Sequence, residues 1–150
     1  DGYPLLKLQD KSPLPIQARV IYSRPQKNDR VIFGELIEYG KVWRLGANEA
    51  TELEFYQNVK INNVKIKKGR YSLFAIPNAD KWTFILNKET DTWGSFRYDA
   101  KKDIVRIDVP VQKQTEIAET FTLVFEKASA GYILSAVWDD VKVSMPVYLQ

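Results

Sequence analysis

A strict alternation of apolar and polar residues constrains the fold of this chain more than any other feature. Between residues 105 and 149 an apolar side chain recurs at every second position in four separate runs. A period of two is typical of β-strands with one buried face, so the last third of the chain predicts four half-buried strands. The apolar positions are Val105, Ile107, Val109 and Val111; Phe121, Leu123 and Phe125; Tyr132, Leu134, Ala136 and Trp138; and Val141, Val143, Met145, Val147 and Leu149.

Short turn sequences separate these runs and similar ones earlier in the chain. Asp139-Asp140 suits a tight hairpin turn, because Asp tolerates left-handed backbone, and Ala130-Gly131 predicts a similar turn. Asn62-Asn63 forms a two-residue loop between two short β-like segments. The strands expected in the first two thirds cover residues 18–22, 31–37, 51–56, 59–61, 64–66, 71–76 and 82–86.

These patterns predict an all-β fold. About nine to eleven short strands in one domain require two packed sheets or a barrel, and consecutive hairpins favour a largely antiparallel β-sandwich, jelly-roll-like, with little helix. Residues 1–15 contain three prolines and no alternation, so we expect an extended N-terminal arm there. Residues 16–150 are expected to form a single β-sandwich domain, as the length of 150 residues also suggests.

Composition excludes several kinds of chemistry. The chain contains no His and no Cys, which removes Ser-His-Asp and Cys-His nucleophilic sites, Cys/His zinc sites and thiol redox chemistry. We therefore expect no metal and no cofactor. The formal charge of +3 is small and the basic residues are scattered, so nucleic-acid binding is not indicated. No run approaches the roughly 20 apolar residues that a membrane-spanning helix needs.

One segment, Tyr39 to Thr51, interrupts the strand pattern. It places two glycines beside Trp43, Arg44, Asn48 and Glu49. This composition indicates a loop held by side-chain hydrogen bonds, and loops of that kind often carry function.

Several motifs in this order give the chain a resemblance to a known family. They lie between Tyr22 and Arg106, and together they resemble the domain of unknown function 2911 family. The resemblance implies an exported bacterial protein with a removable signal peptide and no established activity. The motifs are Tyr22-Ser23-Arg24-Pro25, Arg30-Val31-Ile32-Phe33-Gly34, Trp43-Arg44, Gly46-Ala47-Asn48-Glu49-Ala50-Thr51, Gly69-Arg70-Tyr71-Ser72-Leu73-Phe74-Ala75-Ile76-Pro77, Trp82-Thr83, Asn87, Trp93-Gly94 and Tyr98-Asp99.

The sequence departs from the family pattern at two places. Leu45 stands where a Thr is usual, and Asn28-Asp29 stands where Lys-Gly is usual. Asn and Asp adopt left-handed backbone more readily than other non-Gly residues, so the second change preserves the backbone. The first removes a hydroxyl group, which argues against covalent catalysis at this loop.

The polar residues of the segment allow three interpretations. Arg24, Arg44 and Glu49 can form an ion-pair network that holds the loop, in which Arg44 and Glu49 form a mutual ion pair or share a network. Alternatively, the two guanidinium groups bind an anionic ligand that Asn48 orients. A third interpretation makes Glu49 a catalytic acid or base paired with Glu35 or Asp99.

Two functions from different classes follow. The preferred one is a non-enzymatic ligand-binding or structural module of the cell envelope that takes a small anionic or saccharide ligand. Its candidate residues are Arg24, Trp43, Arg44, Asn48, Glu49, Thr51 and Trp93, the last of which can stack on a flat ligand. The alternative is a hydrolase-like enzyme with Glu49 as acid or base and Arg44 as electrostatic stabiliser.

Because the chain begins at Asp1 without an initiator Met, we expect a processed or shortened chain and a periplasmic or cell-envelope location. The sequence leaves the oligomeric state open.

Overall fold

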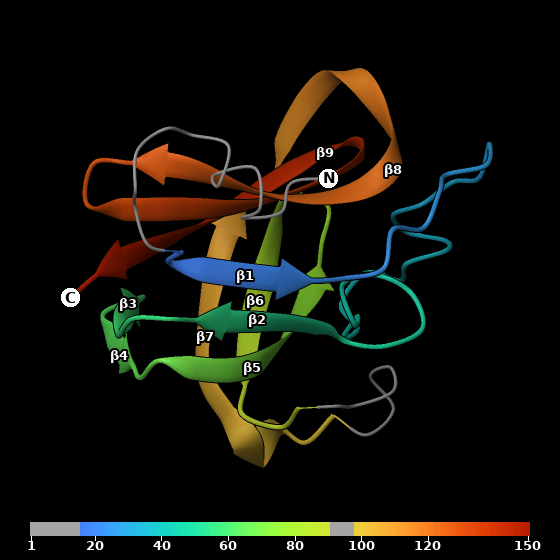
Figure 1. Cartoon of the computed structure of the whole chain (residues 1–150). Coiled ribbons are helices and arrows are strands. Elements are labelled where there is room, and N and C mark those ends of the chain that lie inside the picture. The colour runs from blue at the N-terminus through green and yellow to red at the C-terminus, as the bar shows by residue number, and fades with distance from the viewer. Residues whose placement is uncertain (1–15, 91–97) are drawn as a thin grey trace.

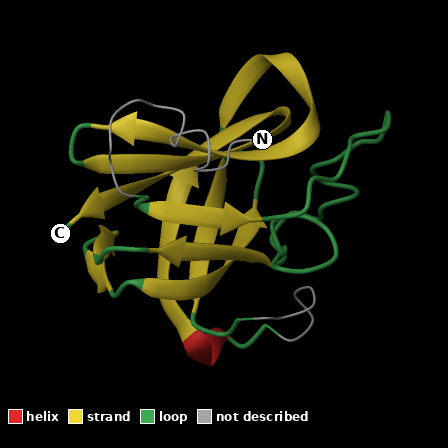
Figure 2. Cartoon of the chain, in the orientation of Figure 1, coloured by secondary structure: helices red, strands yellow, loops and turns green. Residues whose placement is uncertain are grey.

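Two antiparallel β-sheets make up most of the computed structural model, which describes residues 16–90 and 98–150 (Figures 1 and 2). The predicted antiparallel β-sandwich with little helix is confirmed. Within the described residues, helix is limited to one 3-10 turn, η2, at Ala100–Lys102. The arm expected at residues 1–15 lies outside them. The strands are β1 (Ala18–Ile21), β2 (Thr51–Phe55), β3 (Val59–Ile61), β4 (Val64–Ile66), β5 (Gly69–Pro77), β6 (Lys81–Asn87), β7 (Asp103–Pro110), β8 (Gln112–Ala128) and β9 (Gly131–Leu149).

The first sheet has the order β1-β2-β5-β6-β7 and the second the order β4-β3-β9-β8. The β3–β4 hairpin turns at Asn62 and Asn63, whose φ angles of 50° and 62° match the left-handed backbone that the sequence predicts. This hairpin continues the second sheet because β3 pairs with the end of β9, with Val59 opposite Leu149.

Strand β9 reverses its direction at Asp139 and Asp140 (Figure 1). In a straight strand, Ser135 and Ser144 would lie roughly 30 Å apart, yet their hydroxyl oxygens are 2.9 Å apart. Asp139 has a φ of 55°, and the amide of Leu149 donates to the carbonyl of Ala130 at 3.0 Å. The chain reversal predicted at Asp139-Asp140 is therefore present, although both aspartates belong to one continuous strand.

Strand β8 follows β9 around this reversal. Its first residues, Gln112 and Lys113, pair with the second arm of β9, and residues 122–128 pair with the first arm. The register shifts on either side of Ala118, which faces Asp139 at the tip. Bulges of this kind bend a strand and let it turn a corner without losing its pairing.

The prediction of a strand at residues 31–37 is wrong. This segment is a compact turn, in which the amide of Ile37 donates to the carbonyl of Ile32 and the amide of Gly34 donates to the carbonyl of Ile37. Gly34 has a φ of 98°, a conformation that L side chains rarely adopt. A glycine with this backbone ends an extended segment, so the apolar run cannot continue as a strand.

Aromatic side chains fill the space between the sheets. Trp82 of β6 and Trp138 of β9 are almost fully buried, which confirms the core position expected for Trp138. The ring of Phe33 contacts both of them, with centroid distances of 5.3 Å and 6.1 Å. The short turn at residues 31–37 thus contributes to the core even though it is not a strand.

A substitution at Leu123 tests which face of β8 packs against the core. Its side chain is fully buried, so Leu123→Ala should lower the free energy of unfolding by roughly 2–5 kcal/mol through lost burial and a residual cavity. Ile117→Ala, on an exposed part of the same strand, should change it by less than about 1 kcal/mol. Denaturant midpoints measure both, and equal losses would contradict the assignment.

Candidate functional site

The loop from Gly40 to Thr51 begins as an extension of the first sheet. Strand β2 pairs only with residues 69–73 of β5, and the start of the loop continues along the same edge of β5. There Trp43 and Ala75 exchange backbone hydrogen bonds of 2.7 Å and 3.0 Å. The amide of Gly40 donates to the carbonyl of Pro77. The sheet itself therefore fixes the position of Trp43, whose side chain is buried.

The second part of the loop is a tight turn closed by Thr51. The Thr51 hydroxyl donates to the carbonyl of Leu45 at 2.7 Å, and the indole N–H of Trp43 donates to the carbonyl of Gly46 at 3.1 Å. Leu45 adopts a φ of 57° with its side chain fully buried. A Cβ on Gly46 would lie 3.1 Å from the backbone oxygen of Ser23, so this glycine permits close approach of two backbone segments.

Beside this turn lies a cleft of about 390 Å³, here called the basic cleft. Its floor includes the buried indoles of Trp43 and Trp138, and Leu36, which is 44% exposed, lies at its rim. The lining residues are Pro25, Arg30, Leu36, Ile37, Glu38, Lys41, Val42, Trp43, Arg44, Gly46, Ala47 and Trp138.

Positive charge predominates in the basic cleft. Among the residues that the structure describes, Arg30, Lys41 and Arg44 line it together with one carboxylate, that of Glu38. Two hydrogen bonds hold Arg30 in place. Its Nε donates to the carbonyl of Lys27 at 2.9 Å, and its Nη2 donates to the carbonyl of Gln26. Within residues 16–90 and 98–150, the side chains of Lys41 and Arg44 make no ion pair. The arrangement can accept an anionic group beside an aromatic floor.

The structure brings only part of the predicted site together. Trp43 and Arg44 line the basic cleft, and Thr51 supports it from the interior. The guanidinium of Arg24 instead reaches β8, where its Nη2 donates to the Thr122 hydroxyl at 3.3 Å. Asn48 and Glu49 are exposed and do not line the cleft, and Trp93 lies outside the described residues.

The predicted ion pair between Arg44 and Glu49 is wrong. No salt bridge joins these two described residues, and none joins Arg24 to Glu49 in this part of the chain. The turn between them contains Leu45 and Asn48, both with positive φ, so residues five positions apart do not project toward each other.

Sequence reasoning missed Arg30, Lys41, Leu36 and Glu38. Two signals were available, because Arg30 begins one of the motifs that carry the family resemblance and Lys41 lies within the Tyr39–Thr51 segment. Leu36 was assigned to a strand, and that assignment hid its position at the rim of a cleft.

A second polar cluster, at the η2 end of the first sheet, is structural in character. The Tyr98 hydroxyl donates to Oδ2 of Asp103 at 2.6 Å, and Arg106 Nη2 donates to the Tyr98 oxygen at 2.7 Å. Burial and the Asp103 hydrogen bond raise the pKa of Tyr98, which keeps the phenol protonated as a donor. Asp99, which the acid–base interpretation pairs with Glu49, caps η2 by accepting from the Lys101 amide.

Two further properties concern the described residues alone. They contain no group of three or more Asp or Glu side chains that could hold a metal ion. No helix formed by these residues is long and apolar enough to cross a membrane.

Thr51 should be important for stability. Thr51→Val keeps the shape of this buried side chain but leaves the carbonyl of Leu45 without its hydroxyl donor, so the free energy of unfolding should fall by about 1–3 kcal/mol. Thr115→Val, at an exposed position of β8, should change it by less than about 0.5 kcal/mol. Thermal or denaturant unfolding of both variants decides, and an unchanged midpoint for Thr51→Val would show that the loop does not depend on this bond.

Comparison with known proteins places the chain in a family. No curated protein and no solved structure matches it. One family model does match, described as a protein of unknown function (DUF2911), and the match covers residues 10–147, nearly the whole chain. This range contains β1 to β8, nearly all of β9, and every residue that lines the basic cleft. The chain therefore belongs to the DUF2911 family, which is described as a family of proteins of unknown function.

Proposed function

We propose that this protein is a non-enzymatic binding module of the bacterial cell envelope, and that the basic cleft takes a small anionic ligand with a nonpolar part. The observation that carries the proposal is the composition of the cleft. In the part of the chain that the structure describes, three cationic side chains and one carboxylate surround a floor that contains two indoles.

The chemistry of the cationic side chains favours a carboxylate or phosphate. Guanidinium groups present two parallel N–H donors, which match the two oxygens of such a group. Arg44 is half-buried, so its charge is less screened by solvent than that of a fully exposed arginine. Lys41 adds a flexible charge at the same cleft.

The apolar side of the cleft supports a ligand that is more than a bare inorganic ion. Leu36 exposes 44% of its surface at the rim, and Ile37 and Val42, which also line the cleft, are half-buried. Burying part of a nonpolar ligand against these side chains contributes affinity in proportion to the apolar area covered. An aryl or alkyl phosphate or carboxylate combines both properties.

A hydrolase-like function finds less support. A catalytic acid or base must reach the reacting group, usually within about 3 Å or through one water molecule. Glu49 is exposed and does not line the basic cleft, and Glu38 is the only acidic residue among the described residues that line it. A pair of carboxylates across the cleft, which glycoside hydrolysis requires, is not formed by these residues.

The cell-envelope location is part of the proposal and derives from the motifs that resemble exported family members.

Arg44 provides the main test of ligand binding. Calorimetric titration with phenyl phosphate should detect binding to the unaltered protein, with benzyl alcohol as the neutral counterpart binding at least about tenfold more weakly. Arg44→Gln should reduce the affinity for phenyl phosphate by about tenfold or more. Arg19→Gln, which removes the same charge from β1 away from the cleft, should leave it nearly unchanged.

Three results would overturn the proposal. They are no binding of phenyl phosphate, equal binding of the neutral alcohol, and equal losses in Arg44→Gln and Arg19→Gln. The last result would show attraction by net charge rather than a defined site.

Glu49 tests the alternative function. Because Glu49 makes no ion pair with Arg44, the changes in unfolding free energy of Glu49→Gln and Arg44→Met should add in the double variant to within about 0.5 kcal/mol. Glu49→Gln should also retain phenyl phosphate binding. An ester- or glycoside-cleaving activity that is present in the unaltered protein and lost in Glu49→Gln would establish the hydrolase instead.

A further inference from the structure

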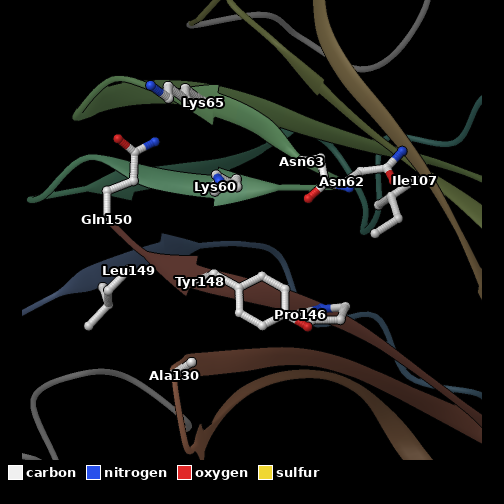
Figure 3. Close-up of a pocket in the computed structure, with 10 residues that line it drawn as sticks. All are labelled: Lys60, Asn62, Asn63, Lys65, Ile107, Ala130, Pro146, Tyr148, Leu149 and Gln150. Atoms are coloured by element: carbon white, nitrogen blue, oxygen red, sulfur yellow. The ribbon is translucent and has the colours of Figure 1, made fainter.

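A larger cleft lies where the β3–β4 hairpin meets the end of β9 (Figure 3). Its volume is about 760 Å³, and it shares no lining residue with the basic cleft. We call it the hairpin cleft. The residues that line it are Lys60, Asn62, Asn63, Lys65, Ile107, Ala130, Pro146, Tyr148, Leu149 and Gln150.

Strand register arranges three of these residues in one row. Lys65 of β4 lies opposite Lys60 of β3, and Lys60 lies opposite Tyr148 of β9. Residues opposite each other on neighbouring strands project to the same face, at an interval of about 4.8 Å per strand. The row therefore presents two ammonium groups and one phenol ring over roughly 10 Å.

The two lysines form a pair of like charges on neighbouring strands. Like charges directly opposite each other destabilise an antiparallel pair. Among the described residues neither Lys60 nor Lys65 makes an ion pair, and no residue that lines the hairpin cleft carries an acidic side chain. An anionic group bound between them would remove this repulsion.

The neighbours of the lysines fit a saccharide. The ring of Tyr148 is on the side of the sheet away from the core and the residue is 49% exposed, with Pro146 next to it on β9 (Figure 3). Such a ring can stack on the C–H face of a pyranose. The amide nitrogens of Asn62 and Gln150 are bound to the carbonyls of Arg106 and Val59, at 2.9 Å and 2.8 Å. These bonds hold both side chains in position, and their amide oxygens are acceptors for sugar hydroxyl groups.

We propose that the hairpin cleft is a second binding site, specific for an acidic saccharide built of uronate units. The Tyr148 ring carries one pyranose, and Lys60 and Lys65 bind carboxylates of the same or the adjacent unit. This site is separate from the basic cleft and does not depend on its function.

The test is calorimetric titration with trigalacturonate, with maltotriose as the neutral counterpart. Trigalacturonate should bind and maltotriose should bind at least about tenfold more weakly. The double variant Lys60→Gln/Lys65→Gln should lose at least about tenfold in affinity. Tyr148→Ala should lose affinity by about fivefold or more, while Tyr148→Phe, which keeps the ring, should stay close to the unaltered protein.

Two control variants distinguish binding in the hairpin cleft from attraction by net charge and from binding in the basic cleft. Lys101→Gln removes one charge from η2, outside the cleft, and should have little effect. Arg44→Gln reports on the basic cleft, because a loss of trigalacturonate affinity in this variant alone would place the saccharide there, so the two proposed sites can fail independently. The double lysine variant should unfold at a temperature no lower than the unaltered protein, because a repulsive pair has been removed.

The proposal is overturned if trigalacturonate does not bind or if maltotriose binds equally well. It is also overturned if Lys101→Gln weakens binding as much as the double variant Lys60→Gln/Lys65→Gln does, or if only Arg44→Gln weakens it. A double lysine variant that unfolds at a much lower temperature would instead show that these lysines are structural.

Discussion

The contact between the indoles of Trp43 and Trp138 is the interaction on which the rest of the structure depends. The two rings stack with a centroid distance of 6.2 Å and an interplanar angle of 18°. Trp138 belongs to β9 in the second sheet, whereas the backbone of Trp43 is bound to β5 in the first. Trp82 and Phe121 pack against Trp43 from the two sheets, at 5.7 Å and 5.2 Å. A loop residue thus connects both layers of the sandwich, and the floor of the basic cleft is as rigid as the core itself.

This connection explains why an irregular loop can keep one shape. The backbone donors and acceptors of a loop are not paired by the regular hydrogen bonds of a sheet. Here the Thr51 hydroxyl and the Trp43 indole N–H donate to two of the loop carbonyls, those of Leu45 and Gly46. Leu45 holds a φ of 57°, which is unfavourable for a non-glycine residue, and its fully buried side chain offsets that cost. Leu45 therefore places a hydrophobic side chain in the core. Arg44 and Gly46, its neighbours, are fixed at the cleft as a result.

The sequence allowed the strands to be predicted wherever a period of two coincides with a turn signal, as at Asn62-Asn63 and Asp139-Asp140. It did not allow prediction of how β8 wraps around the reversal of β9, because that path depends on register shifts near Ala118, which leave no mark on the alternation. Residues 31–37 were misassigned because an apolar turn that packs against tryptophans resembles a strand in composition. For the site, the Tyr39–Thr51 segment was located correctly as a loop held by side-chain hydrogen bonds. The direction of each side chain was not predictable, since positive φ at Leu45 and Asn48 separates Arg44 from Glu49.

Positive charge at the hairpin cleft has one possible cause that involves no ligand, because lysines on edge strands protect a sheet from pairing with another molecule. β4 is the edge strand of the second sheet, so edge protection accounts for Lys65. It does not account for Lys60, because β3 lies between β4 and β9 and has no free edge where those strands pair with it. Nor does it account for an exposed aromatic ring at Tyr148 in the same row. A bound anion that also stacks on an aromatic ring accounts for all three residues together, whereas edge protection accounts for only one.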